Sequence, residues 1–339
     1  MSAHIAGLGW VTPLGTGLEE VFERIKRGEI AESKLVKNPE TGRGHRYVPV
    51  PPKSVDAVGR NPRLRRSSAI SYFAVAAGLA ALENAGLKIT PEIAPRTAVV
   101  FAICDGGVLY TRKFYEQLVK QGANAASPLL FPETVYNAPA SHLAALLGID
   151  GASYTLVGDS SVGLAALHFG AQLLGLGGID QCVVVGAEEC DWILCEAYAD
   201  WHLARTPLAE GAAAVVLQRE GKWAVQTHPG VTFFRRAEAE AALDRAVREI
   251  GASAATDFVA VSANGTFIDA RENAVLARHC PSAQALRIKA ALGEAPGAGA
   301  LCQVVAAALS GSADALVSVL GFNQQASAAR IIRAKATND

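Results

Sequence analysis

The sequence has nearly equal numbers of basic and acidic residues, and few charged residues overall. Its 339 residues include 31 basic and 32 acidic side chains, a formal net charge of −1, and charged residues make up 19% of the chain. A protein that binds nucleic acid by bulk electrostatics needs a basic surface, so this balance argues against a nucleic-acid partner. Half of the chain is apolar, unlike a disordered protein. We expect two domains or one large composite domain.

The sequence also lacks the short motifs of common cofactor sites. It contains no phosphate-binding loop, dinucleotide fingerprint, zinc-ligand spacing or RNA-binding signature, so we expect no cofactor and no metal. The six cysteines, at 104, 182, 190, 195, 280 and 302, are scattered. Cys190 and Cys195 do not form a metal knuckle, and a chain of this length needs no disulfide framework. These features favour the reducing cytoplasm.

Two long stretches lack charge, residues 160–179 and 295–313, and each is long enough to span a membrane. They are rich in glycine or alanine, without the leucine-like composition or Lys/Arg flanks that insertion and topology favour. A helix that is apolar on all sides can equally lie at the centre of a large protein. We therefore predict two buried helices and no membrane partner. The N-terminal residues show no basic segment followed by a hydrophobic run, so no secretory signal is expected.

The remaining pattern predicts an α/β layered fold. A helix is predicted at 18–27. A second helix is predicted to end at Asn84, and either Ser67 or Ser68 can cap its start. Residues 37–66 are rich in Pro, Gly and Arg and are predicted to form a surface excursion. Short apolar runs typical of strands covered on both faces occur at 97–102, 181–186, 212–218, 257–262 and 315–321.

The order of these segments suggests an internal repeat. Each half of the chain has one long uncharged helix followed by an apolar strand, with 160–179 before 181–186 and 295–313 before 315–321. We therefore predict two related halves, residues 1–225 and 226–339, with the divide near 220–232.

Three local features could carry chemistry. Ser160, in the string from Gly158 to Gly163, could be a nucleophile at a strand-to-helix turn, but it lacks the G-x-S-x-G pattern and a recognisable base. The simpler interpretation is that residues 159–161 cap the next helix. Lys289 and Glu294 are either buried ions or boundary charges. A basic cluster, which comprises Arg60, Arg63, Arg65 and Arg66, is either a solvated loop or a docking site for an acidic partner or phosphate.

Taken together, the segments resemble the β-ketoacyl-ACP synthase family over nearly the whole chain. The resemblance implies a thiolase-like layered α-β-α-β-α fold of two related halves. Each matching piece is weak alone, and the order and spacing make the set specific. The pieces are 7–15, 127–132 with Asn137, Gly177, 185–188, 205–208, 210–217, 264–266 with Asp269 and Glu272, Lys289, 297–299 and 321–322.

The catalytic residues of that family are largely replaced. The resemblance implies a cysteine nucleophile, two histidines and a nearby lysine. Ser160 stands at the cysteine position, Asn264 at the first histidine and Glu294 at the second, while Lys289 remains. Phe322 occupies the position of the substrate gate, although Asn323, Gln324 and Gln325 replace the glycines that follow it.

These replacements argue against ordinary condensation by the chain alone. A thiolate accepts acyl groups from thioesters near neutral pH, whereas a serine needs a base. The two histidines normally hydrogen-bond the developing enolate oxygen. Asn264 could donate one such bond, but an ionised Glu294 would repel the negative charge unless it were protonated.

Three hypotheses follow. The first is a catalytically degenerate homologue similar to a chain-length factor, which pairs with an active ketosynthase in type II polyketide or fatty-acid-like biosynthesis. The second is an acyltransferase, hydrolase or decarboxylase that uses Ser160 with Glu294 or an unrecognised histidine as base. The third is a non-catalytic acyl-carrier-protein-binding or structural module that could form a homodimer, and residues 60–66 could contact an acidic carrier protein. The resemblance also implies a large apolar dimer interface, with a ketosynthase or with itself.

Overall fold

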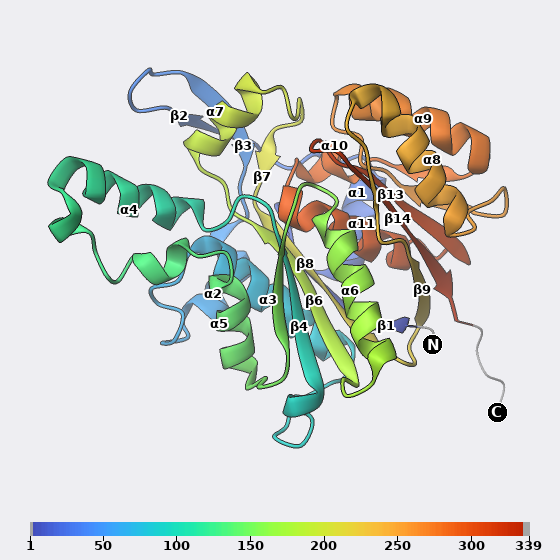
Figure 1. Ribbon diagram of the computed structural model, residues 1–339, viewed down its shortest axis with the longest axis horizontal. Coiled ribbons are helices and arrows are strands. Elements are labelled where there is room, and N and C mark those ends of the chain that lie inside the picture. Colours follow the sequence, from blue (N-terminus) through green and yellow to red (C-terminus); the bar gives the residue numbers. More distant parts are fainter. Residues whose placement is uncertain (1–2, 335–339) are drawn as a thin grey trace.

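The structure is a computed structural model that describes residues 3–334 (Figure 1). Its main sheet follows the strand order β12-β11-β13-β14-β9-β1-β8-β6-β4-β5, and β10 pairs with β14 off this path. The sheet divides into two groups of five strands. The apolar runs predicted to be strands are confirmed, and they all belong to these groups. The first group is β1 (Ala3–Val11), β4 (Thr97–Ile103), β5 (Ser153–Val157), β6 (Gln181–Glu188) and β8 (Gly211–Gln218).

The second group repeats the arrangement of the first. It consists of β9 (Trp223–Thr227), β11 (Phe258–Ala260), β12 (Gln284–Leu286), β13 (Asp314–Leu320) and β14 (Gln325–Arg333), with β10 (Val231–Thr232) beside it. When each group is numbered along the chain, both have the order 3-2-4-5-1. Both also have parallel pairs on one side and antiparallel pairs on the other.

The two groups are joined by their first strands. β1 pairs antiparallel with β9, and His4 lies opposite Ala224. The predicted divide between residues 225 and 226 falls inside β9. Because β9 is the first strand of the second group, the repeated strand order would place the boundary just before Trp223. The division of the chain into two related halves stays a prediction.

Helices form three layers around the two groups of strands (Figure 1). On one outer face, α3 (Ala69–Asn84) and α5 (Ala138–Leu147) cover the first group. On the other outer face, α8 (Ala239–Glu249) and α9 (Phe267–His279) cover the second. Between the groups lie α6 (Val162–Leu176) and α11 (Pro296–Leu309). This is the predicted α-β-α-β-α layering.

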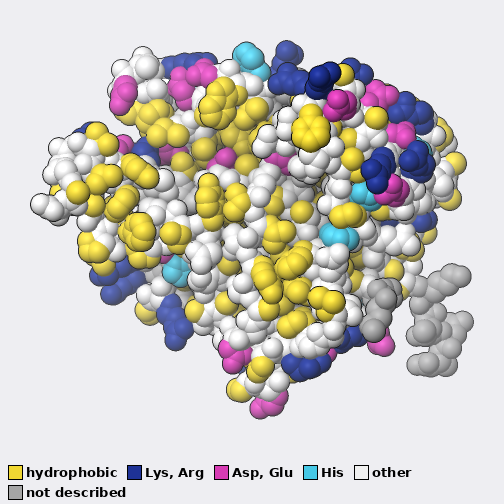
Figure 2. Space-filling view, viewed as in Figure 1, with side chains coloured by type: hydrophobic (Ala, Val, Ile, Leu, Met, Phe, Trp, Pro, Cys, Tyr) yellow, Lys and Arg dark blue, Asp and Glu magenta, His cyan; other side chains and the backbone are white. Residues whose placement is uncertain are grey.

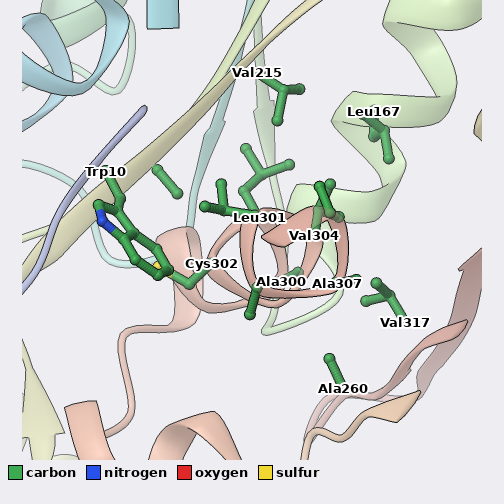
Figure 3. Close-up of a cluster of buried hydrophobic side chains, with 14 of the residues drawn as sticks. Trp10, Leu167, Val215, Ala260, Ala300, Leu301, Cys302, Val304, Ala307 and Val317 are labelled. Atoms are coloured by element: carbon green, nitrogen blue, oxygen red, sulfur yellow. The ribbon is translucent and has the colours of Figure 1, made fainter. Parts of the chain in front are cut away.

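The two uncharged stretches form these central helices. Every residue of α11 from Pro296 to Ala308 is buried. Figure 3 shows its side chains between Val215 of the first group and Val317 of the second. A helix in contact with protein on all sides needs no polar face, which explains its composition. Among residues 3–334, none of the helices combines the length and the hydropathy that a membrane crossing requires.

The surface excursion has more structure than its sequence indicates. β2 (Lys34–Lys37) and β3 (Gly44–Val48) form a hairpin, and β3 pairs in parallel with β7 (Leu208–Ala209). The short strands are largely exposed, so they lack the apolar run by which a buried strand is recognised. The remaining helices are α1 (Leu18–Lys26), α2 (Asp56–Gly59), α4 (Val108–Gln121), α7 (Trp192–Asp200) and α10 (Ile288–Leu292).

The start of α3 corrects a predicted cap. Ser68 precedes the helix with an extended backbone, but its hydroxyl does not cap the helix. The Ser68 hydroxyl instead donates to Glu189, and the same Glu189 oxygen accepts the N–H of Ile70 at 3.0 Å. A buried carboxylate at the end of β6 therefore does the capping, which no local pattern could indicate.

Candidate active site

Ser160 lies in the turn before α6, and its neighbours Asp159 and Ser161 are bonded to each other. Asp159 Oδ1 accepts the backbone N–H of Ser161 at 2.9 Å and the Ser161 hydroxyl at 2.8 Å. The Ser160 hydroxyl points elsewhere and donates to Glu294 Oε1 at 3.2 Å. The predicted side-chain cap by residues 159–161 is therefore wrong, since Ser161 is the N-cap of α6 and no side chain caps the helix.

Glu294 is the centre of the predicted site. The Lys289 ammonium lies 2.8 Å from Glu294 Oε1 and 2.9 Å from Oε2, and Asn264 Nδ2 donates to Oε2 at 3.1 Å. With the bond from Ser160, three side chains donate hydrogen bonds to this carboxylate, and the ion pair with Lys289 contacts both of its oxygens. These four residues are at most 2% exposed. The structure thus brings together the four positions that the sequence singled out.

A tight turn explains the contact between Lys289 and Glu294. Lys289 lies in α10, and Gly293 after it has a φ of +89°, a conformation that favours glycine. The turn carries Glu294 back over the helix. Its backbone is fixed by the loop before β7 and by β7 itself, since Glu294 N–H donates to the Pro207 carbonyl at 2.9 Å and Ala209 N–H donates to the Glu294 carbonyl at 2.8 Å.

Asn264 has no donor left for a substrate. Its side-chain nitrogen donates to the Leu203 carbonyl at 3.1 Å as well as to Glu294. Its side-chain oxygen accepts the Thr266 hydroxyl at 2.7 Å. The single enolate bond considered from the sequence would therefore require one of these internal bonds to break.

The space beside Lys289 is small. A cavity lined by Lys289, Glu210, Thr12 and Cys302 has a volume of about 20 Å³, enough for one water molecule. An acyl chain does not fit there without movement of the surrounding segments.

A second buried cluster lies beside this centre, and the sequence did not single it out. Glu188, at the end of β6, accepts backbone N–H groups of Cys104 at 3.2 Å, Asp105 at 3.3 Å and Gly297 at 3.0 Å. The Tyr198 hydroxyl, from α7, donates to Asp105 Oδ2 at 3.1 Å. The only local signal was that Cys104 and Asp105 directly follow a buried strand.

Burial dominates the electrostatics of this cluster. It raises the pKa of Asp105 to about 6, with a smaller contribution from the charge of Glu294. Burial, and then the charge of Asp105, raises the pKa of Glu188 well above its ordinary value. Ligand atoms of Cys104, Asp105 and Glu188 lie within 4.8 Å of one another. Because backbone amides already occupy Glu188, we assign no metal to this group.

The predicted gate, Phe322, lies in the loop between β13 and β14. Its ring packs edge-to-face on Tyr198, with ring centroids 5.5 Å apart. Asp159 Oδ2 accepts the N–H of Asn323 at 2.8 Å, and a Cβ on Gly321 would lie only 2.0 Å from the same oxygen. Asp159 therefore ties the gate loop to the turn that carries Ser160, an arrangement that requires glycine at position 321.

Comparison with known proteins identifies a matching family and similar folds. Residues 3–222 match the family described as "Beta-ketoacyl synthase, N-terminal domain". The chain is similar to the 3-oxoacyl-(acyl-carrier-protein) synthase 2 of Vibrio harveyi, with 25% identity over 187 residues, or 55% of this chain and 45% of that protein. The match thus spans less than half the length of that curated relative.

Two solved structures share the whole fold. One is described as the ishigamide ketosynthase/chain length factor, with a TM-score of 0.82, 19% identity and coverage of 99% of this chain and 100% of that chain. The other is a type II polyketide synthase acyl-carrier protein in complex with its ketosynthase bound to the hexaketide. It has a TM-score of 0.82, 13% identity and coverage of 98% of this chain and 99% of that chain.

Proposed function

The chain belongs to the β-ketoacyl synthase family, and we propose that it is a catalytically degenerate member that acts as a chain-length-factor-like partner of an active ketosynthase. The pathway would be type II polyketide or fatty-acid-like biosynthesis. One observation carries the proposal: the Glu294 carboxylate is bound by donors from Ser160, Asn264 and Lys289.

This arrangement opposes each step of condensation. Among residues 3–334, the base that the Ser160 hydroxyl contacts is Glu294, and Lys289 and Asn264 already bind the oxygens of that carboxylate. Decarboxylation of a malonyl thioester would place negative charge near the carboxylate of Glu294, where donors are needed instead. Asn264 and Lys289, the two donors near that position, are both bonded to Glu294.

The surface supports a protein partner. β5 is the last strand of the sheet path, so one of its edges is unpaired, and Tyr154 and Val157 on it are 43% and 56% exposed. An exposed apolar sheet edge is a template for pairing with another chain. Figure 2 shows further apolar side chains gathered over α4 and α6. Exposed apolar residues of α4 and the segment after it are Tyr115, Val119, Leu129, Phe131 and Tyr136.

The basic cluster supports contact with an acidic carrier protein. Arg60, Arg63, Arg65 and Arg66 are exposed, and none has a salt bridge within the described chain. Arg63 donates to the Ala145 carbonyl at 3.1 Å, which places the cluster beside α5. We expect substitution of Arg65 and Arg66 by serine to weaken carrier-protein binding and its salt dependence. Unchanged affinity would remove this role.

Co-expression tests the partner role. The chain is produced with a ketosynthase that retains the Cys-His-His residues and is encoded beside it, and the two are purified through a tag on one of them. We expect a stable complex that condenses, while the isolated chain does not. Val157→Asp on β5 should reduce co-purification strongly. Ile30→Asp is the matched control, because Ile30 is 73% exposed and lies outside the proposed interface.

The outcomes are distinct. Elongation by the isolated chain would overturn the proposed loss of catalysis. A stable homodimer with no affinity for the ketosynthase would instead favour the carrier-binding module and contradict the chain-length-factor role.

The acyl-enzyme hypothesis retains one supporting observation. The Ser160 hydroxyl donates to a carboxylate oxygen at 3.2 Å, which is the direction of proton transfer that a serine nucleophile needs. The ion pair of Glu294 with Lys289 opposes it, and exposure of the isolated chain to acyl thioesters decides between the two.

A further inference from the structure

Cys190 and Cys195 form a close pair of thiols outside the site described above. Their sulfur atoms lie 3.5 Å apart, and the two residues are 6% and 5% exposed. Cys190 lies between β6 and α7, while Cys195 lies in the first turns of α7. All six cysteines of the chain are free thiols.

The helix start holds the two thiols together. Asp191 is the N-cap of α7, and its side chain accepts the N–H of Ile193 at 3.2 Å. Cys190 therefore occupies the position before the cap and Cys195 the fourth helical position, which are the two positions that pack together in a hydrophobic staple. The contact is thus fixed by local backbone geometry, and two thiols stand where apolar side chains would serve for packing.

The pair can be reached from solvent through Cys195. This residue lines a hollow of about 200 Å³ together with His45, Arg46, Arg205 and Tyr198. Arg46 and Arg205 are exposed. The S–H of Cys190 lowers the pKa of Cys195, and the same contact raises the pKa of Cys190 well above its ordinary value. Cys195 is therefore the more acidic thiol of the pair, and it faces the entry path.

We propose that Cys190 and Cys195 form a redox-active dithiol, which hydrogen peroxide or an organic hydroperoxide converts to an intramolecular disulfide. This inference does not rest on the proposed function.

The chemistry balances with the hydroperoxide as oxidant. The Cys195 thiolate attacks the terminal peroxide oxygen and the O–O bond breaks, which gives a sulfenic acid on Cys195. The hydroxide from hydrogen peroxide takes a proton and leaves as water, and the alkoxide from an organic hydroperoxide takes a proton and leaves as an alcohol. The Cys190 sulfur, having lost its proton, then attacks the Cys195 sulfur and displaces the hydroxyl group as water. Two thiols are oxidised, one peroxide is reduced, and the protein loses two hydrogen atoms.

The disulfide would tighten the segment next to the gate. An S–S bond of about 2 Å requires the two sulfur atoms to approach each other by about 1.5 Å. Tyr198 lies about one turn further along α7 and contacts Phe322. Cys190, Cys195 and Tyr198 belong to one hydrophobic cluster. Oxidation of the two thiols would therefore alter the contact between Tyr198 and Phe322.

Cys104 provides an internal comparison. It is more exposed than Cys195, but burial and then the charge of Asp105 raise the pKa of Cys104. If exposure alone decided reactivity, Cys104 would be oxidised first. The paired geometry predicts that Cys195 reacts first and that the product is a disulfide to Cys190.

The test is oxidation of the folded full-length protein with a modest excess of hydrogen peroxide, followed by alkylation in acid and non-reducing peptide mapping. Proteolysis before Asp191 separates Cys190 from Cys195, so only a disulfide keeps the two peptides joined. Tandem mass spectra distinguish Cys190 from Cys182, which shares its peptide. We expect the linked pair to form roughly tenfold or more faster than oxidation of Cys104, and to be reversed by dithiothreitol.

Substitutions assign the order of events. In Cys190→Ala, the sulfenic acid on Cys195 should persist and be captured by dimedone, whereas Cys195→Ala should show no comparable adduct on Cys190. Cys280→Ala, which removes a different buried thiol, should behave as wild type. The proposal is overturned if folded wild-type protein forms no 190–195 link while Cys104 is oxidised. Wild-type mapping gives this result even if a variant fails to fold.

Discussion

Two buried glutamates near the start of α11 differ in what binds them. Glu294 is 0% exposed and is bound by side chains of Ser160, Asn264 and Lys289, including one cation. Glu188 is 1% exposed and is bound by backbone amides. Substitutions can remove side-chain donors one at a time, whereas backbone donors persist whatever residue is present. Substitutions of the surrounding residues can therefore remove donors from Glu294, whereas they leave the backbone donors of Glu188 in place.

The largest effect should come from the cation. Lys289→Met leaves the Glu294 carboxylate buried without a counter-charge, and we expect a loss of about 3–5 kcal/mol in the free energy of unfolding. Denaturant unfolding monitored by circular dichroism measures it. The double variant Lys289→Met/Glu294→Gln should recover most of the loss, because no buried charge remains. Lys113→Met on the surface is the control. A double variant as unstable as Lys289→Met would contradict this account of the centre.

The cluster around Glu188 should make the free energy of unfolding depend on pH. Burial raises the pKa of Asp105 to about 6, so the native state favours the protonated acid. The stability from this group is full below its unfolded pKa near 4 and is lost as pH rises through 6. The difference is up to about 3 kcal/mol. Asp105→Asn should flatten the fall in unfolding free energy across this window. An unchanged pH profile would show that Asp105 does not titrate there.

The two glutamates can be compared by one substitution at each. Glu188→Gln keeps a side-chain oxygen for the backbone amides of Cys104 and Gly297, so we expect a loss of only about 1 kcal/mol. Glu294→Gln leaves the Lys289 ammonium buried and unpaired, and its cost should be several times larger. Equal costs in denaturant titrations would mean that the two sites do not differ in the way proposed.

Ser160 should have the smallest effect. Ser160→Ala removes one of the bonds to Glu294 and leaves the ion pair with Lys289 intact. We expect a change of about 1 kcal/mol or less in the free energy of unfolding, and no change in co-purification with the ketosynthase. Loss of the complex would mean that Ser160 has a role beyond the bond to Glu294.

Much of the fold could be predicted from the sequence because its signals are local. The runs at 97–102 and 315–321 became β4 and β13, since apolar residues covered on both faces leave a continuous pattern. The uncharged stretches became α6 and α11 for the same reason. The hairpin of β2 and β3 was missed because exposed short strands leave no such pattern.

The candidate site divides in the same way. Ser160, Asn264, Lys289 and Glu294 were found by the family's spacing, and the structure brings them together. Their functional roles remain predictions. Asp105 and Tyr198 were missed because 93 positions separate them and neither carries a local motif. The role of Asp159 at the gate loop, through Asn323, likewise depends on a contact across 164 positions.

The most direct test of the account is intact-mass spectrometry of the isolated chain after exposure to acyl and malonyl thioesters, with Ser160→Ala as the matched variant. Because Glu294 is held by Lys289 and bound by Ser160 and Asn264, we expect no acyl adduct on either protein and no decarboxylated product. A covalent acyl adduct on the wild-type chain that disappears in Ser160→Ala would contradict the account and establish Ser160 as a nucleophile.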